Sequence, residues 1–207
     1  MKMSKQYTHE KLIVISPKSF NKLRKIIEDR YDKLGAGTKQ NPIDFNDIDV
    51  SNLDSFCDDH NRGIFEGTLF KYIDISDWDV SNVTDMSYMF FMCKELKSVG
   101  DISGWDVSSV ENMSNMFSDC KKLKSVVDIS KWDVSSVTNM EFMFCDCNNF
   151  NQDLSNWDVS SVTDMTCTFC NCKSFNKDIS NWNVSNVRYH AYTFYDCPIK
   201  DEYKPKF

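Results

Sequence analysis

Hydrophobic and polar residues follow one order along most of the chain, in units of 25 to 27 residues. Within a unit, apolar residues recur at steps of three and four, and the first full unit places them at Val83, Met86, Met89, Phe90 and Cys93. This spacing predicts a short helix, whereas a coil made of strands alone would need alternation with a period of two. The Asp-Ile-Ser segment before each tryptophan contains β-compatible residues and predicts a short strand. Each unit should therefore combine a short parallel strand, a tight turn and one or two helical turns.

The units are near-copies of one another. Five tryptophans mark them at spacings of 27, 27, 25 and 25 residues, namely Trp78, Trp105, Trp132, Trp157 and Trp182. Self-similarity at such a period is typical of stacked coils, because one coil alone is too small to bury its apolar face. We therefore expect an α/β solenoid of short parallel strands and short helices, which offers a surface for binding rather than a pocket for chemistry.

An apolar stripe at helical spacing precedes the repeats, formed by Phe20, Leu23, Ile27, Tyr31 and Leu34. Ser16 and Pro17 before it are typical of a helix start, and Gly35 after it is typical of a helix end. The pattern predicts a helix at about residues 17–34. We interpret this helix as a cap over the open core of the first coil.

The predicted elements divide the chain into three parts. Residues 1–45 form an N-terminal segment with the capping helix, residues 46–197 form a solenoid of about six coils, and residues 198–207 form a C-terminal tail. The first coil is degenerate, because its Asp-Val-Ser-Asn segment is followed by an insertion near Asp58–Thr68 that departs from the repeat. We expect this insertion to protrude as a loop.

Composition and charge narrow the class of protein. Of the 207 residues, 41% are hydrophobic and 14% aromatic, which is enough for a continuous core. The net charge of −7 argues against a general affinity for nucleic acid or anionic membranes. No apolar run of about 18 residues exists, so no membrane-spanning helix is expected. The basic start with its short apolar run lacks the features of a signal peptide, which favours a cytoplasmic location.

Nine cysteines are present, and five of them occupy one repeat position: Cys93, Cys120, Cys147, Cys172 and Cys197. In a stack of coils these thiols should form an inward-facing column of small apolar groups. The odd total and the absence of an export signal favour reduced thiols. A zinc site is the alternative, formed by Cys167-x-x-Cys170-x-Cys172 and Cys145-x-Cys147, but a structural site usually shows four ligands in two paired spacings.

Aspartates and tryptophans also repeat. Two rows of Asp should stack along the coils, the first at Asp74, Asp101, Asp128, Asp153 and Asp178, the second at Asp79, Asp106, Asp133 and Asp158. The simplest interpretation is that each carboxylate accepts backbone N–H groups, as in Asx turns. A calcium site and an acidic docking face are the alternatives. The tryptophans indicate a packed edge whose indole N–H groups bond carbonyls, with an exposed aromatic ladder as the alternative.

No enzyme signature is present in the sequence. It contains three histidines and lacks a Gly-rich phosphate loop and a nucleophile elbow. We therefore expect no catalytic residues, no cofactor and no metal.

The segment 150–165 (FNQDLSNWDVSSVTDM) and its four neighbours resemble the repeats of BspA-like leucine-rich repeat surface proteins, specifically the mycoplasma-type repeat of about 25 residues. The resemblance covers residues 46–197. It implies a leucine-rich-repeat-like solenoid and a role in protein binding, often at cell surfaces. The last coil departs from the pattern, because Arg188, Tyr189 and His190 replace Thr-Asp-Met and Thr193 replaces the second Met.

We expect a non-enzymatic protein-binding repeat scaffold, whose partner is another protein and whose oligomeric state stays open. Binding specificity should lie where the copies differ, because the shared residues build the frame. The candidate partner-binding residues are Asp58, Asp59 and Arg62 in the insertion, Lys94, Lys97, Lys121, Lys122 and Lys124 between coils, and Arg188, Tyr189, His190 and Tyr192 in the last coil.

Two other functions fit the same sequence. The first is an intracellular inhibitor, borne by a phage or mobile element, that blocks a host defence or nucleic-acid-handling enzyme through an acidic surface. The second is a secreted or surface adhesin that lacks its leader here, which would place the protein at the cell surface.

Overall fold

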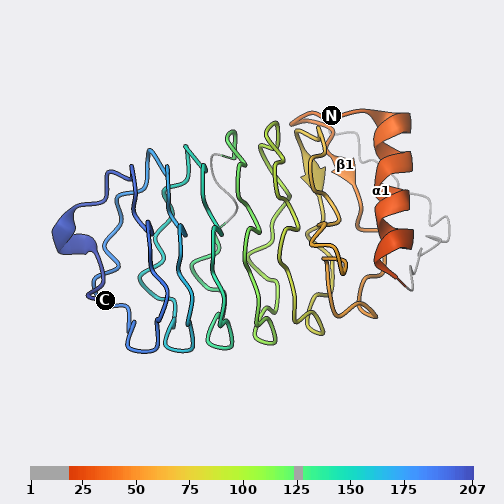
Figure 1. Ribbon diagram of the computed structural model, residues 1–207. Coiled ribbons are helices and arrows are strands. Elements are labelled where there is room, and N and C mark those ends of the chain that lie inside the picture. Colours follow the sequence, from red (N-terminus) through yellow and green to blue (C-terminus); the bar gives the residue numbers. More distant parts are fainter. Residues whose placement is uncertain (1–18, 124–127) are drawn as a thin grey trace, which may run out of the picture.

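The computed structural model of the chain describes residues 19–123 and 128–207. Successive copies of the repeat form successive coils, which lie side by side in one row (Figure 1). Helix α1 (Phe20–Leu34) lies across the first coil, and the 3₁₀ helix η1 (Asp201–Tyr203) lies at the opposite end. The molecule therefore has two different ends, joined by a row of similar coils.

Helix α1 packs on the first coil with one face. It begins after Ser19 and ends at Gly35, whose φ of 73° lies in the left-handed region that glycine adopts without a steric penalty. Leu23 and Ile27 are fully buried, and Tyr31 packs edge-on against Phe70 with ring centroids 5.0 Å apart. The expected helix start at residues 17–18 lies outside the described residues.

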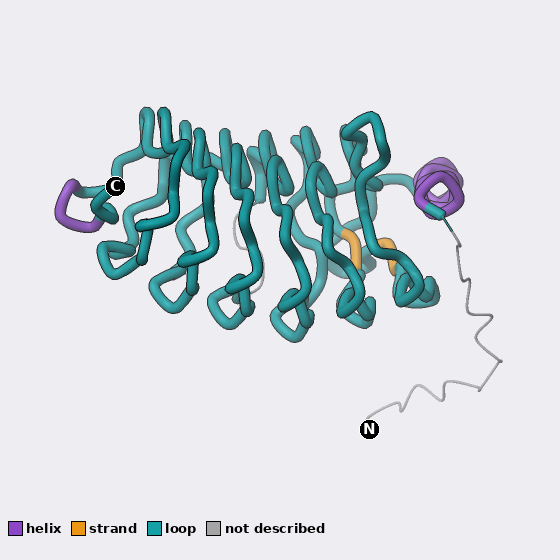
Figure 2. Tube along the Cα trace, turned by 60° about the horizontal axis from the view of Figure 1, so that its bottom comes forward, coloured by secondary structure: helices purple, strands orange, loops and turns teal. Residues whose placement is uncertain are grey.

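The structure contradicts the expected α/β, leucine-rich-repeat-like solenoid of repeating strands and helices. Within the described residues, α1 is the only α-helix, and the only strands are β1 (Ile43–Asp44) and β2 (Ile73–Asp74), which pair in parallel. Turns and irregular segments make up nearly all of the remaining trace (Figure 2). Between other coils, isolated parallel bridges connect equivalent residues, as at Asp85–Asn112 and Asn139–Asp164.

The residues expected to be helical form hydrogen bonds with the neighbouring coil instead. The Tyr88 N–H donates to the Ser114 carbonyl at 3.0 Å, and the Phe90 N–H donates to the Met116 carbonyl at 2.9 Å. Tyr88 has a φ of 56°, which ends any helical run at that residue. Hydrogen bonds between residues three positions apart alternate with these inter-coil bonds, as in the bond from the Phe91 N–H to the Tyr88 carbonyl. The three- and four-residue spacing therefore reflects consecutive turns.

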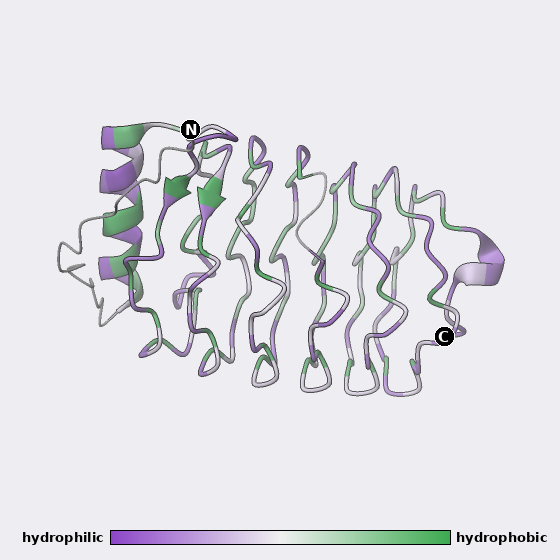
Figure 3. Ribbon diagram, turned by 180° about the vertical axis from the view of Figure 1, so that it is seen from behind, coloured by the Kyte–Doolittle hydropathy of each residue, from purple (hydrophilic) through white to green (hydrophobic). Residues whose placement is uncertain are grey.

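A continuous core of stacked rings runs through the row of coils. The members of the central column are fully buried, and neighbouring rings lie 5.3 to 5.9 Å apart and within 14° of parallel, as in Phe90–Phe117, Phe117–Phe144 and Phe144–Phe169. Hydrophobic and hydrophilic segments follow one another along each coil (Figure 3). Burying one phenylalanine side chain contributes about 1.5–3 kcal/mol, so the column is a main source of stability.

Buried polar groups bond from one coil to the previous one. Four of the five indole N–H groups donate to a carbonyl of the preceding coil, as Trp157 does to Ile129 at 2.9 Å. The indole N–H of Trp105 is buried and has no partner within the described residues. The thiol of Cys120 donates to the Phe90 carbonyl at 3.1 Å, and its equivalents in three other coils do the same. These columns belong to the frame of the molecule.

Neither α1 nor any other helix in the described ranges has the length and apolar character needed to span a lipid bilayer.

Candidate binding cleft

The aspartate rows form Asx turns. The carboxylate of Asp101 accepts hydrogen bonds from the hydroxyl and the N–H of Ser103, at 2.7 and 3.1 Å. The same pairing recurs along both rows, for example at Asp158 and Ser160. These hydrogen bonds hold the pKa of Asp101 below its ordinary value, because they stabilise the ionised carboxylate. Within the described residues, no group of three or more His, Cys, Asp or Glu side chains is placed to hold a metal ion.

The cysteine column faces the core. All nine cysteines are free thiols, and burial raises the pKa of Cys93 to about 12. Cys145 and Cys167 lie nearer the surface, and burial followed by the neighbouring Cys170 raises the pKa of both. A raised pKa keeps a thiol protonated and therefore weakly nucleophilic.

The predicted residues of the insertion stabilise their own loop. The carboxylate of Asp58 accepts the N–H groups of His60 and Arg62, each at 2.9 Å, and the Arg62 side chain at 2.7 Å. Burial acts to raise the pKa of Asp58, but the hydrogen bonds and charge of Arg62 outweigh it and lower the pKa. Asp59 is exposed on the turn between them. This group lies in the first coil, at the α1 end of the row.

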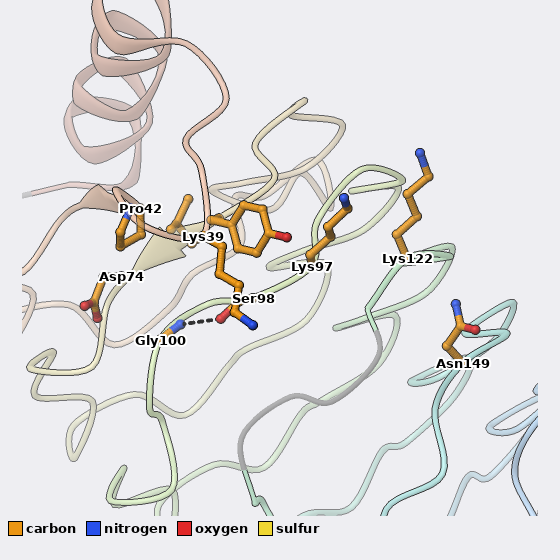
Figure 4. A pocket seen from close by; sticks show the side chains of 10 residues that line it. Lys39, Pro42, Asp74, Lys97, Ser98, Gly100, Lys122 and Asn149 are labelled. Atoms are coloured by element: carbon orange, nitrogen blue, oxygen red, sulfur yellow. Dashed lines mark hydrogen bonds between the residues drawn. The ribbon is translucent and has the colours of Figure 1, made fainter.

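The predicted lysines divide into two groups. Lys94 and Lys121 converge on Asp119, with ammonium-to-carboxylate distances of 3.3 and 2.9 Å. Lys97 and Lys122 lie instead on the same cleft, a hollow of about 630 Å³ at the edge of the coils (Figure 4). Lys124 lies outside the described residues.

Five parts of the chain build the cleft. Lys39 and Pro42 come from the connection between α1 and β1, and Tyr72 directly precedes β2. Lys97 and Lys122 follow on the next two coils, with Asn149 on the coil after them (Figure 4). The cleft therefore crosses several repeats and also includes residues that precede them.

Backbone contacts position these side chains. The Ile43 N–H donates to the Tyr72 carbonyl at 3.0 Å, which brings the Lys39 segment beside the second coil. Gly37 permits this approach, because its φ is 72° and a Cβ atom there would lie 2.3 Å from the Tyr72 carbonyl oxygen. The Lys97 N–H donates to the Lys71 carbonyl at 2.8 Å, so the next coil continues in register.

The cleft carries an excess of positive charge. The ammonium group of Lys97 lies 5.7 Å from the centre of the Tyr72 ring, a cation–π distance. Lys122 donates to Glu95 at 2.7 Å, and this hydrogen bond holds the pKa of Glu95 below its ordinary value. Within the described residues, Lys39 and Lys97 form no ion pair. An anionic group entering the cleft would therefore meet two ammonium groups that are not neutralised.

Sequence reasoning found Lys97 and Lys122 but missed Lys39, Tyr72 and Asn149. Tyr72 occupies the repeat position of Ser98, so it is one of the differences between copies that signal a binding surface. Lys39 lies in the connection before the first coil and has no counterpart in the repeat. Only the folded backbone places it beside Lys97.

The predicted residues of the last coil lie at the opposite end from the insertion (Figure 1). Tyr189 and Tyr192 are 63% and 68% exposed, and Arg188 is exposed beside them. The His190 ring stacks on Phe207, with centroids 4.4 Å apart. The structure thus separates the candidate residues into a first-coil loop, a lysine group and a terminal surface. It does not unite them in one site.

The fold and the cleft define a protein of tandem stacked repeats. The chain belongs to the DUF285 family, described as a mycoplasma protein of unknown function, whose model matches residues 38–129 and 121–202. This match fits a mycoplasma-type repeat, but it does not identify a BspA-like leucine-rich repeat protein specifically. Comparison with curated proteins and with solved structures gives no match.

Proposed function

We propose that this protein is a non-enzymatic repeat scaffold that binds another protein, and that the lysine-lined cleft takes an acidic segment of the partner. The observation that carries this proposal is that Lys39, Lys97 and Lys122 all line one concave surface. Ligand sites are usually concave, and surface hollows of a few hundred Å³ accommodate several side chains.

The chemistry of the lining supports a binding role. Lysine ammonium groups donate hydrogen bonds to carboxylates, and the Tyr72 ring adds a flat apolar contact. Ser98 and Asn149 supply further polar groups at the rim. The lining also includes one carboxylate, Asp74, which accepts hydrogen bonds from the N–H and the hydroxyl of Ser76, so the lining lysines outnumber it three to one. The resemblance to surface proteins with BspA-like repeats also favours protein binding.

The remaining charge of the chain gives this site a specific salt dependence. The net charge of −7 repels an acidic partner at long range, whereas the cleft attracts it at short range. Moderate salt weakens both effects, and at about 0.15 M the long-range repulsion is confined to roughly 8 Å. Binding should therefore tolerate physiological salt better than binding to a uniformly basic protein.

The test is a titration with a fluorescent twelve-residue peptide of alternating Glu and Gly, followed by anisotropy. The double variant Lys97→Glu, Lys122→Glu should bind it about tenfold more weakly, because two attractive contacts become repulsive. The double variant Lys22→Glu, Lys33→Glu is the matched control, since it makes the same change of net charge and both lysines are exposed on α1 outside the cleft. Equal affinity of the two double variants would refute the role of the cleft.

A further inference from the structure

Hydrogen bonds between coils have a consistent direction on the face formed by the methionine and phenylalanine turns. In each interior coil, four N–H groups at alternate positions donate to carbonyls of the following coil. The first full coil shows this at 2.9 to 3.0 Å from Met86, Tyr88, Phe90 and Met92. The last pair of coils repeats it at 2.7 to 2.9 Å from Met165, Cys167, Phe169 and Asn171. The N–H groups on this face therefore point toward the C-terminal end of the row.

At the N-terminal end of the row, side chains of α1 donate hydrogen bonds to backbone carbonyls. At the N-terminal end, the Arg24 guanidinium donates to the carbonyls of Gly63 and Glu66 in the first coil. Arg30 donates to the Asp44 carbonyl and pairs with Asp47. Helix α1 thus supplies cationic donors to three backbone carbonyls at this end of the row. These carbonyls of the N-terminal end therefore find hydrogen-bond donors within the chain itself.

At the C-terminal end, the backbone donors on this face have no hydrogen-bond acceptor among the described residues. By the register of the preceding coils, the N–H groups of His190, Tyr192, Phe194 and Asp196 occupy the donor positions, and no described residue accepts a hydrogen bond from them. Side chains of the tail pack on this coil, since the Phe207 ring stacks on His190 with centroids 4.4 Å apart and the Lys204 ammonium lies 5.9 Å from the centre of the Phe194 ring. The tail backbone accepts no hydrogen bond from the four N–H groups, and its Tyr203 carbonyl accepts the Ile179 N–H at 3.0 Å instead. We name these four residues the donor edge.

The donor edge also has the backbone geometry of the interior coils. Tyr192 and Asp196 have φ angles of 59° and 53°, in the left-handed region. In the interior coils the same geometry occurs at Tyr88 and Met92, where carbonyls of the next coil accept the N–H groups.

We propose that the donor edge binds an extended, acidic segment of a partner protein. The carbonyls of that segment would accept the four N–H groups, as a further coil would, and a carboxylate would pair with Arg188. Arg188 is exposed and forms no ion pair with any described residue. Exposed rings of Tyr189, Tyr192 and Tyr195 flank the edge and offer the flat contacts common in interfaces. This mode of recognition is strand addition at an open edge.

A second copy of the chain is a poor occupant. Two donor edges placed together would set N–H groups against N–H groups, which leaves both rows unpaired. Stacking the donor edge on the N-terminal end of another copy would require α1 and its arginines to leave the carbonyls that they cap. The charge and hydrogen-bond pattern therefore favour a different protein with acceptors and carboxylates.

The experiment uses the full chain, labelled with ¹⁵N, and a twelve-residue peptide of alternating Val and Glu, which favours an extended conformation. We expect chemical-shift changes and slower hydrogen exchange at the amides of His190, Tyr192, Phe194 and Asp196. The charge-reversed peptide of alternating Val and Lys should bind at least about tenfold more weakly. If the Val-Glu peptide leaves these four amides unchanged, the proposal is wrong.

Two variants separate this surface from the lysine-lined cleft. Arg188→Glu should weaken the Val-Glu peptide about tenfold, whereas Lys22→Glu, with the same change of charge at the other end, should not. The double variant Lys97→Glu, Lys122→Glu should retain the amide changes of the donor edge. Loss of those changes in the double variant, with retention in Arg188→Glu, would assign the peptide to the cleft and overturn the proposal. Melting temperatures within about 4 °C of wild type establish that each variant is folded.

Discussion

The tryptophan column offers a matched pair of sites that differ in one hydrogen bond. Trp157 and Trp105 occupy the same repeat position, are 3% and 6% exposed, and each stacks on the tryptophan of the next coil. The indole of Trp157 donates to the Ile129 carbonyl at 2.9 Å, whereas the indole N–H of Trp105 has no partner among the described residues. We predict that Trp157→Phe is more destabilising than Trp105→Phe.

The difference in unfolding free energy between the two variants follows from the contributions that are not the same at the two sites. Both substitutions remove the same part of a buried ring, so the loss of packing is similar. Trp157→Phe also loses a hydrogen bond worth about 1 kcal/mol, while Trp105→Phe removes an unpaired buried N–H whose burial costs about 1–3 kcal/mol. The free energies of unfolding of the two variants should therefore differ by about 2–4 kcal/mol, which corresponds to roughly 4–16 °C in melting temperature for a chain of this size.

The assay is urea unfolding followed by far-UV circular dichroism, because both variants lose a fluorescent indole. Trp132→Phe serves as an internal control, since Trp132 donates to the Ile102 carbonyl at 3.0 Å and should behave like Trp157. Equal losses of stability at Trp105 and Trp157 would refute the assignment of an unpaired N–H to Trp105.

Two further predictions concern the turns. The hydrogen bonds from Ser108 and Ser160 lower the pKa of Asp106 and Asp158 in the folded state. These two carboxylates therefore stabilise the fold fully above the ordinary carboxyl pKa of about 4, and the stabilisation is lost as the pH falls through the lower folded pKa. In urea titrations, the free energy of unfolding of the double variant Asp106→Asn, Asp158→Asn should fall less steeply between pH 5 and pH 2 than that of the wild type. Asn can replace Asp in this turn, because Asn183 already accepts the Ser185 N–H at 3.2 Å. An unchanged dependence of the unfolding free energy on pH would contradict this prediction. Gly63→Ala should lower the melting temperature by roughly 6–12 °C, or about 3 kcal/mol, because its Cβ would lie 1.8 Å from the Tyr88 carbonyl oxygen. Gly104→Ala, where a Cβ meets nothing within 4 Å, is the control in the same calorimetric scan, and a similar loss in both would show that the contact at Gly63 is not the cause.

The helical interpretation of the repeat was wrong for a specific reason. Val83, Met86 and Met89 fall at steps of three, which suit both an α-helix and a series of tight turns. The choice between the two depends on where the N–H groups find acceptors. In this chain the N–H of Met86 finds the carbonyl of Asn112, a residue 26 positions later, and no local pattern reveals that pairing.

The candidate site was predicted in part. Lys97 and Lys122 were identified because they lie where the copies differ, and the structure places both on the cleft. Lys94 and Lys121 were identified on the same grounds, but Asp119 pairs with both of them. Ion pairing between coils decides which surface charges stay available, and it depends on the stacking register.

The sequence by itself determined the period of the repeat, the rings and thiols that recur within it, and the short-range Asp-x-Ser pairs that form its turns. Each of these features follows from residues close together in the chain or from their simple repetition. The tertiary structure alone decided that the coils consist of turns, that Lys39 joins Lys97 at one cleft, and that the two ends of the row differ. The physical reason is that the inter-coil hydrogen bonds of the turn face join residues 24–26 positions apart and run predominantly in one direction. That direction leaves acceptors for α1 to cap at one end and a row of donors at the other.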